Sequence, residues 1–162
     1  MKDTPQSLLE DVKNNLPLLY DVDEDYKVSL LKYSENIIYK VEFGKSSHVV
    51  FRIHRPGYHD IEELEGEIRW MDEIHKDTQV RLPVVYRGRD GGFLQKMRTS
   101  GGETVYCSVI SFLYGSALGE LKGEALLDGL EKLGEITARL HIQSINRDKS
   151  VKIKRFCWDI NN

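Results

Sequence analysis

The stretch Tyr33–Trp70, YSENIIYKVEFGKSSHVVFRIHRPGYHDIEELEGEIRW, predicts a strand, a tight turn, a second strand and a charged helix. In the run VVFRIH, successive side chains point to opposite faces because strands have a period of two. Arg52 therefore lies inside a β-branched and aromatic run, and Val50 and His54 share its face. A cation in such a place needs a partner, because an unpaired buried charge is costly.

The helix that follows carries a candidate partner for Arg52. Asp60 can cap the N-terminus of this helix, and Glu63 completes a capping-box pattern. Glu67 borders an apolar stripe at helical spacing that is made by Ile61, Leu64, Ile68 and Met71. If this stripe packs on the sheet, Glu67 points toward the strands, and we expect an ion pair between Arg52 and Glu67.

A basic residue on a central strand, held by a carboxylate on the next helix, can direct positive charge at a phosphate. In kinases, a Lys–Glu pair of this kind orders the nucleotide phosphates. Arginine offers a planar, permanently charged fork that suits carboxylate or phosphate. Ion-pair networks are also common structural features. Spacing alone therefore favours a structural ion pair on an α+β domain over a nucleotide site.

Three segments carry a resemblance to a known family: SENIIYKV, VVFRIHRPGYHDIEELEGEIRWMDEI and LPVVYRGRDGGFL. They resemble the N-terminal lobe of the aminoglycoside phosphotransferase and choline kinase family, from about Tyr26 to Trp158. The resemblance implies an α+β, protein-kinase-like fold, with an antiparallel sheet of about five strands, one packed helix and a following C-terminal helix. It also implies transfer of the γ-phosphoryl group of ATP or GTP, with Mg²⁺, to a hydroxyl of a small-molecule acceptor.

The same resemblance implies where a nucleotide binds. Arg52 would contact the phosphates and Glu67 would orient Arg52. Ile110 takes the gatekeeper position, and the carbonyl of Ser111 and the N–H of Leu113 would bond the edge of the base. The tight turn that would cover the phosphates consists of Ser34, Glu35 and Asn36.

The chain divides into three expected parts. Residues 1–25 form a helix over 5–15, capped by Thr4 and followed by Pro17, and then a turn. Residues 26–115 form the nucleotide-binding lobe, and residues 116–162 form a linker and the first helical part of a truncated C-terminal lobe, with a helix over 123–142. Strands are expected over 27–32, 37–43, 49–54, 82–87, 93–97 and 104–113.

The residues that complete phosphoryl transfer are not found in the chain. In the resembled family they come from a His-Gly-Asp catalytic loop, a following Asn and a later metal-binding Asp. We therefore assign no catalytic residue and no metal ligand, and expect the nucleotide-binding portion of a small-molecule kinase that is truncated before the catalytic loop. The alternative is a non-catalytic binding or regulatory module on the same scaffold, with Phe112–Tyr114 or the helix over 123–142 as its partner surface. An unrelated α+β domain stays open as a third interpretation.

Composition limits the remaining classes. A formal net charge of −3 argues against a nucleic-acid binder, and the basic cluster Lys149, Lys152, Lys154 and Arg155 is expected to be a solvated face. No apolar run approaches the ~20 residues of a membrane span, and no signal peptide is apparent. Cys107 and Cys157 lack metal-type spacing, so we expect free thiols and a cytoplasmic protein. An isolated lobe would expose the apolar stripe of the helix over 123–142, which predicts self-association.

Overall fold

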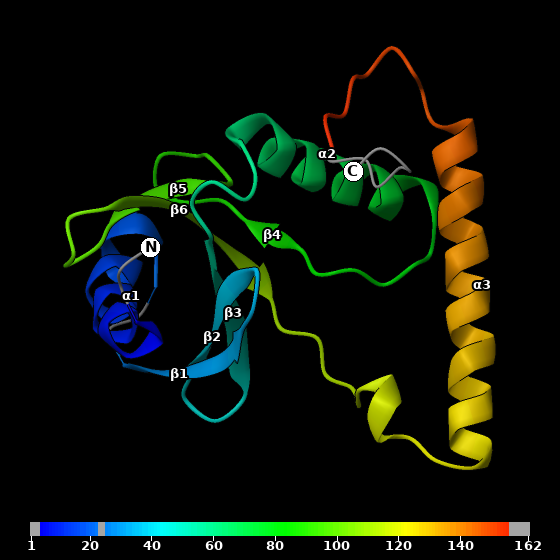
Figure 1. Cartoon of the computed structure of the whole chain (residues 1–162), viewed down its shortest axis with the longest axis horizontal. Helices are drawn as coiled ribbons and strands as arrows, with labels where there is room; N and C mark the ends of the chain where they lie inside the picture. Colours follow the sequence, from blue (N-terminus) through cyan, green and yellow to red (C-terminus); the bar gives the residue numbers. More distant parts are fainter. Residues whose placement is uncertain (1–3, 23–24, 156–162) are drawn as a thin grey trace.

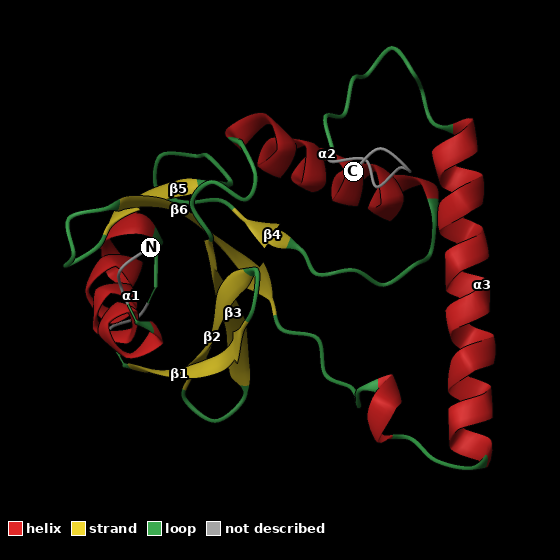
Figure 2. Cartoon of the chain, viewed as in Figure 1, coloured by secondary structure: helices red, strands yellow, loops and turns green. Residues whose placement is uncertain are grey.

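The strands form one antiparallel sheet with helices on both of its faces (Figure 1). The computed structural model describes residues 4–22 and 25–155. The sheet has six strands in the order β1-β2-β3-β6-β4, and β5 pairs with β6 as well. This mixture of helices and antiparallel strands confirms the α+β fold class, with one strand more than the roughly five expected (Figure 2). The elements are α1 (Pro5–Leu19), β1 (Tyr26–Tyr33), β2 (Asn36–Phe43), β3 (Ser47–His54), α2 (Ile61–Asp77), β4 (Val85–Tyr86), β5 (Gln95–Arg98), β6 (Thr104–Ser111), a 3-10 turn (Leu118–Glu120) and α3 (Glu124–Asn146).

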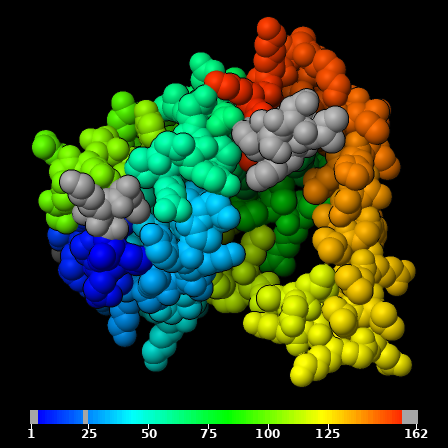
Figure 3. Space-filling model, viewed as in Figure 1, coloured from blue at the N-terminus to red at the C-terminus, as the bar shows by residue number. Residues whose placement is uncertain are grey.

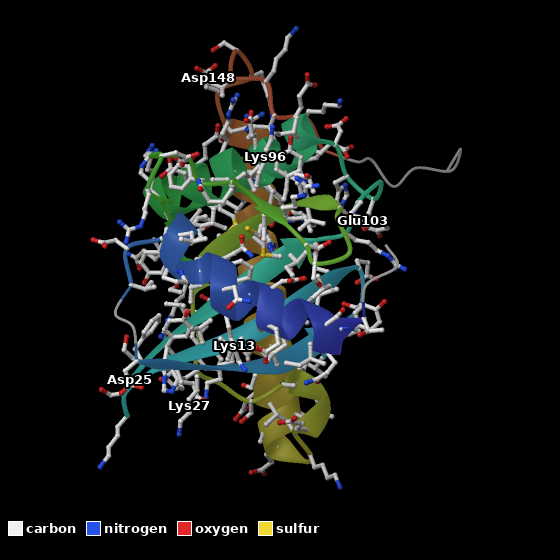
Figure 4. The ribbon with its side chains drawn as sticks, turned by 90° about the vertical axis from the view of Figure 1, so that its left-hand side faces the viewer. Lys13, Asp25, Lys27, Lys96, Glu103 and Asp148 are labelled. Atoms are coloured by element: carbon white, nitrogen blue, oxygen red, sulfur yellow. The ribbon has the colours of Figure 1, made fainter. Side chains whose placement is uncertain are left out.

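The main core lies between α1 and one face of the sheet, and α1 crosses that face in Figure 4. Alternating residues of β2 and β3 point into this core, and Tyr39 lies opposite Phe51 in the register. Burial of this apolar surface is the main favourable contribution to folding. The fully buried side chains of the core are Leu8, Val12, Leu16, Tyr39, Val41, Phe51, Ile53, Met97 and Cys107.

The end of α1 corrects an expectation, because the helix continues through Pro17 to Leu19 instead of ending before the proline. A proline inside a helix leaves the carbonyl four residues earlier without its usual N–H donor. Here the hydroxyl of Tyr26 donates to the carbonyl of Lys13 at 2.6 Å and supplies that missing hydrogen bond. The predicted cap at the other end is confirmed, since the Thr4 side chain accepts from the N–H of Ser7.

Helix α2 lies on the sheet face opposite α1, since its Glu67 bonds Arg52, which alternates with the core residues of β3. The predicted capping box is confirmed. The N–H of Glu63 donates to Asp60 at 2.9 Å, and the N–H of Asp60 donates to the Glu63 carboxylate at 3.2 Å. This capping box fixes where α2 begins, and therefore the position of Glu67 along the helix.

Two expected strands are shorter in the structure. The strand expected over 82–87 is reduced to Val85–Tyr86, and the one over 104–113 ends at Ser111. Pro83 lies outside β4, which fits the absence of a ladder donor in proline. Beyond Ser111 the chain leaves the sheet, and it is in this segment that Leu113 lies. Cys107 is buried in the core, and Cys157 lies outside the described residues.

Helix α3 stands apart from the sheet and meets α2 near its C-terminal end (Figure 1). The indole of Trp70 donates to Gln143 at 3.1 Å, and Gln143 donates to Asp77 at 2.9 Å. Arg147 pairs with Glu73 at 2.9 Å. The rest of α3 projects away as a separate column in the space-filling view (Figure 3). Its exposed apolar side chains are Leu127, Leu130, Leu133, Ile136, Ile142 and Ile145.

None of the helices within 4–22 and 25–155 combines the length and apolar character needed to cross a bilayer.

Candidate functional site

The expected ion pair between Arg52 and Glu67 is confirmed. Nη1 of Arg52 lies 2.7 Å from Oε1 of Glu67, and the two side chains are only 14% and 21% exposed. Burial alone would raise the pKa of Glu67, but the charge and hydrogen bond of Arg52, together with Arg155, lower it below its ordinary value. Glu67 is therefore a carboxylate at neutral pH, and it holds the Arg52 fork in one orientation.

Arg52 keeps donor capacity for a further anion. A guanidinium carries several N–H donors, and Nη1 is the atom bonded to Glu67. Within the described part of the chain, Nε of Arg52 is buried and has no acceptor. An unpaired buried donor destabilises the folded chain. Because Nε has no accessible surface, the terminal N–H groups that Glu67 does not occupy are the donors left for a ligand, and a phosphate oxygen matches the charge of the fork.

The gatekeeper candidate lies on the same sheet face as Arg52. Ile110 of β6 is opposite Val50 in the register, and Ser108 is opposite Arg52. Ser111 closes the edge toward β4: its N–H donates to the carbonyl of Val84 at 2.8 Å, and its hydroxyl accepts from the N–H of Val84 at 2.9 Å. These contacts fix the backbone just before Leu113.

The turn between β1 and β2 is held by its own hydrogen bonds. The N–H of Ser34 donates to the carbonyl of Asn36 at 3.0 Å. Hydrogen bonds from its own backbone N–H, and then from the hydroxyl of Ser34, lower the pKa of the exposed Glu35 carboxyl. Asn36 begins β2 and pairs with His54. The turn thus lies beside the C-terminal end of β3, the strand that carries Arg52. Several polar groups of the turn are already bonded to one another.

A second cation reaches Glu67 from the end of the described chain. Nη1 of Arg155 lies 3.0 Å from Oε2 of Glu67, and Lys154 pairs with Glu62 at 3.1 Å. Arg155 is exposed, as expected for a solvated basic face, and it also has a partner in the candidate site, the carboxylate of Glu67. The partners are 88 residues apart in the sequence, so no local sequence pattern could predict this contact.

A polar and aromatic cluster joins the β2–β3 hairpin to the segment after β6. One ring nitrogen of His48 is hydrogen-bonded to the hydroxyl of Tyr114, and the other lies 3.2 Å from Glu42. The rings of Phe112 and Tyr114 meet edge to face at 5.0 Å, and the ammonium of Lys40 lies over Phe112. This cluster lies beside the segment expected to bond a base, and the sequence offered no signal that would pair its members.

The described residues do not offer a metal site of their own. Among them, no group of three or more His, Cys, Asp or Glu side chains is placed to hold an ion.

A model described as the phosphotransferase enzyme family matches residues 32–155 of the chain. The chain belongs to this family. The structure of a microcompartment-associated aminopropanol kinase is similar at 31% identity and a TM-score of 0.76, over 91% of this chain and 44% of that one. An amicoumacin kinase in complex with AMP-PNP, Ca²⁺ and Ami shares the fold at 18% identity and a TM-score of 0.55, over 65% of this chain and 31% of that one. No curated protein matches the chain.

Membership of the phosphotransferase family confirms the resemblance and the kinase-like fold, and it excludes the unrelated domain. The chain spans less than half the length of the aminopropanol kinase. The contact between Arg52 and Glu67 thus occurs in a chain whose family transfers phosphoryl groups. The nucleotide-binding roles of the individual residues stay predictions.

This phosphotransferase-family chain also contains a buried neutral histidine beside the pair. His54 lies 3.1 Å from the hydroxyl of Ser108. Burial, followed by the charge of Arg52, lowers the pKa of His54 to about 3. The imidazole is thus uncharged at neutral pH and adds no positive charge next to Arg52.

Acidification is expected to destabilise the lobe through His54. The unfolded state binds a proton near pH 6.5, whereas the folded state binds it only near pH 3, so stability is lost as the pH falls between these values. The upper limit is about 1.4 kcal/mol per pH unit. Urea unfolding at pH 7, 6 and 5 measures this slope. His54→Gln should flatten it, whereas the exposed control His141→Gln should retain it; an unchanged slope in His54→Gln would contradict the assignment.

Proposed function

We propose that the chain is the nucleotide-binding part of a small-molecule kinase, in which Arg52 binds the nucleotide phosphates and Glu67 orients Arg52. The observation that carries this proposal is the largely buried Arg52–Glu67 pair between β3 and α2 in a phosphotransferase-family chain. An arginine on a central strand presents its donors to a ligand on the sheet face that carries α2, while the helix carboxylate prevents the side chain from turning away. A bidentate guanidinium binds phosphate well because its fork matches two oxygens.

The other half of the proposed site binds the base. Ile110 would contact the base from the sheet, and the carbonyl of Ser111 and the N–H of Leu113 would bond its edge. The bonds between Ser111 and Val84 support this role because they hold the backbone in place before Leu113. The turn from Ser34 to Asn36 would cover the phosphates. For this, hydrogen bonds within the turn would have to break so that its N–H groups can donate to the ligand.

We propose that residues outside this chain carry out the phosphoryl transfer itself. The lobe would span residues 26–115, and residues 116–162 would begin a C-terminal lobe that continues with the catalytic loop, as the length of the aminopropanol kinase suggests. That lobe would hold Mg²⁺ and the acceptor. The two similar structures are kinases of an aminopropanol and of amicoumacin, which are small molecules. We therefore propose a small-molecule hydroxyl as the acceptor and ATP or GTP as the donor.

The exposed apolar face of α3 favours a second candidate function, a non-catalytic binding or regulatory module. Leu130 and Leu133 are about half exposed on this face. Large contiguous apolar patches on a folded chain mark interaction surfaces. In the 162-residue chain we propose that a second copy covers this face of α3 by self-association.

Calorimetric titration of the chain with Mg·ATP, Mg·GTP, ADP and adenosine tests the proposed function. We expect measurable binding of the triphosphates and affinity that falls with each phosphate removed, because Arg52 acts on the phosphates. Comparison of ATP with GTP then identifies the base that is preferred. Absence of triphosphate binding, or equal affinity for ATP and adenosine, would contradict the proposal and favour the non-catalytic module.

A further inference from the structure

The last described segment lies directly on α2. A Cβ built on Gly66 would lie 2.2 Å from the carbonyl oxygen of Lys154, so any larger residue at this position would push the segment away. This contact is between backbone atoms, and it shows that residues near Lys154 rest on the helix surface itself. Glycine is required here by close approach, since no side chain fits between the two backbones.

Charged contacts hold the segment in this position. Lys154 pairs with Asp60 and with Glu62 near the N-terminus of α2. Arg155 donates to the carbonyl oxygen of Glu63 at 3.3 Å and to Oε2 of Glu67 at 3.0 Å. The segment therefore binds both the start of α2 and the carboxylate that faces Arg52.

Glu67 is thus shared between two arginines, one on each oxygen. Oε1 accepts from Arg52 and Oε2 accepts from Arg155. With both oxygens bonded, the carboxylate cannot rotate about its last torsion without breaking a charge-assisted hydrogen bond. Arg155 is the more enclosed of the two cations in its segment, with 34% of its side chain exposed against 49% for Lys154.

We infer that Arg155 is a positioning residue for nucleotide phosphates: it holds the second oxygen of Glu67, so that the first oxygen keeps the Arg52 fork directed at the ligand. This inference rests on the proposed phosphate-binding role of Arg52. The contact of Arg155 with Glu67 connects the segment after α3 to the phosphate site. The position of Arg155 therefore affects how tightly Arg52 binds phosphate. The net charge of the three groups is positive, which leaves the cluster complementary to an anion.

Nucleotide titrations of three variants test the inference. Arg155→Met removes the charge and keeps a long side chain, Arg155→Lys keeps the charge, and Lys152→Met removes an exposed charge of the same segment. We expect Arg155→Met to weaken ATP binding roughly tenfold, as for loss of one hydrogen bond to a charged group. Arg155→Lys should recover part of that loss, and Lys152→Met should stay close to the wild type. Adenosine affinity should be unchanged in all three.

The outcomes separate this inference from the function on which it rests. If Arg52→Ala loses ATP binding and Arg155→Met does not, the inference is overturned and the proposed function stands. An equal loss of ATP and adenosine affinity in Arg155→Met would show a purely structural role and would also overturn it. Absence of ATP binding by the wild type overturns both. A double-mutant cycle of Arg155→Met with Glu67→Gln in urea adds a readout without nucleotide, in which additive midpoint shifts would contradict the contact.

Discussion

Arg52→Ala is expected to abolish strong triphosphate binding, with a loss of affinity of at least about 30-fold. Removing one member of a hydrogen-bonded, partly buried charge pair costs about 2–5 kcal/mol of binding free energy where that pair contacts a ligand. The change removes the proposed phosphate donor and leaves Glu67, whose carboxylate repels phosphate, without its partner on β3. Calorimetric titration with Mg·ATP measures the effect.

The control for this change is Arg69→Ala on α2. Arg69 pairs with Glu65 at 3.4 Å on the exposed side of the helix, so its removal takes away one positive charge from the same helix without touching the site. We expect its ATP affinity to stay within about twofold of the wild type, as for an exposed ion pair. Unchanged ATP affinity in Arg52→Ala would exclude the phosphate role of Arg52, and a parallel loss in Arg69→Ala would assign the effect to overall charge.

The paired change Leu130→Glu and Leu133→Glu is expected to convert an assembly into monomers. These side chains are 48% and 49% exposed in the single chain, so burying the rest of each leucine contributes about half of the value for a fully exposed one, on the order of 1 kcal/mol. Two carboxylates on this face would repel those of a second copy. Light scattering at increasing concentration should give a mass that is a multiple of 18.7 kDa for the wild type and 18.7 kDa for the variant.

Leu18→Glu serves as the matched control, because Leu18 is 70% exposed but lies on α1 instead of α3. The control should assemble as the wild type does. A wild-type mass of 18.7 kDa at the highest concentration would refute self-association. Assembly that is lost equally in the control would place the contact elsewhere on the surface.

The Arg52–Glu67 contact could be predicted because both of its determinants are local. Strand alternation fixes the face of Arg52, and the capping box of Asp60 and Glu63 fixes the helical phase of Glu67. The resemblance then supplied the tertiary packing that brings the two elements together. Features set by a period and a cap are therefore within reach of sequence reasoning.

The end of α1 could not be predicted, because the deciding contact is tertiary. The pattern favoured a helix end before Pro17, but Tyr26 on the next strand satisfies the carbonyl that the proline leaves open. For the same reason the role of Arg155 was missed, since only the folded chain places it against Glu67. The His48–Tyr114 contact spans 66 residues and was hidden in the same way.

A nitrogen-15 NMR titration with a non-hydrolysable ATP analogue and Mg²⁺ tests the central claim most directly, because it locates the ligand on the chain. The account predicts that the side-chain Nε–H signal of Arg52 and the backbone amide signal of Leu113 both shift and saturate together, with one dissociation constant. Adenosine alone should shift Leu113 and leave Arg52 largely unchanged. Saturating analogue that shifts neither signal, or that shifts only residues of α3, would contradict the account.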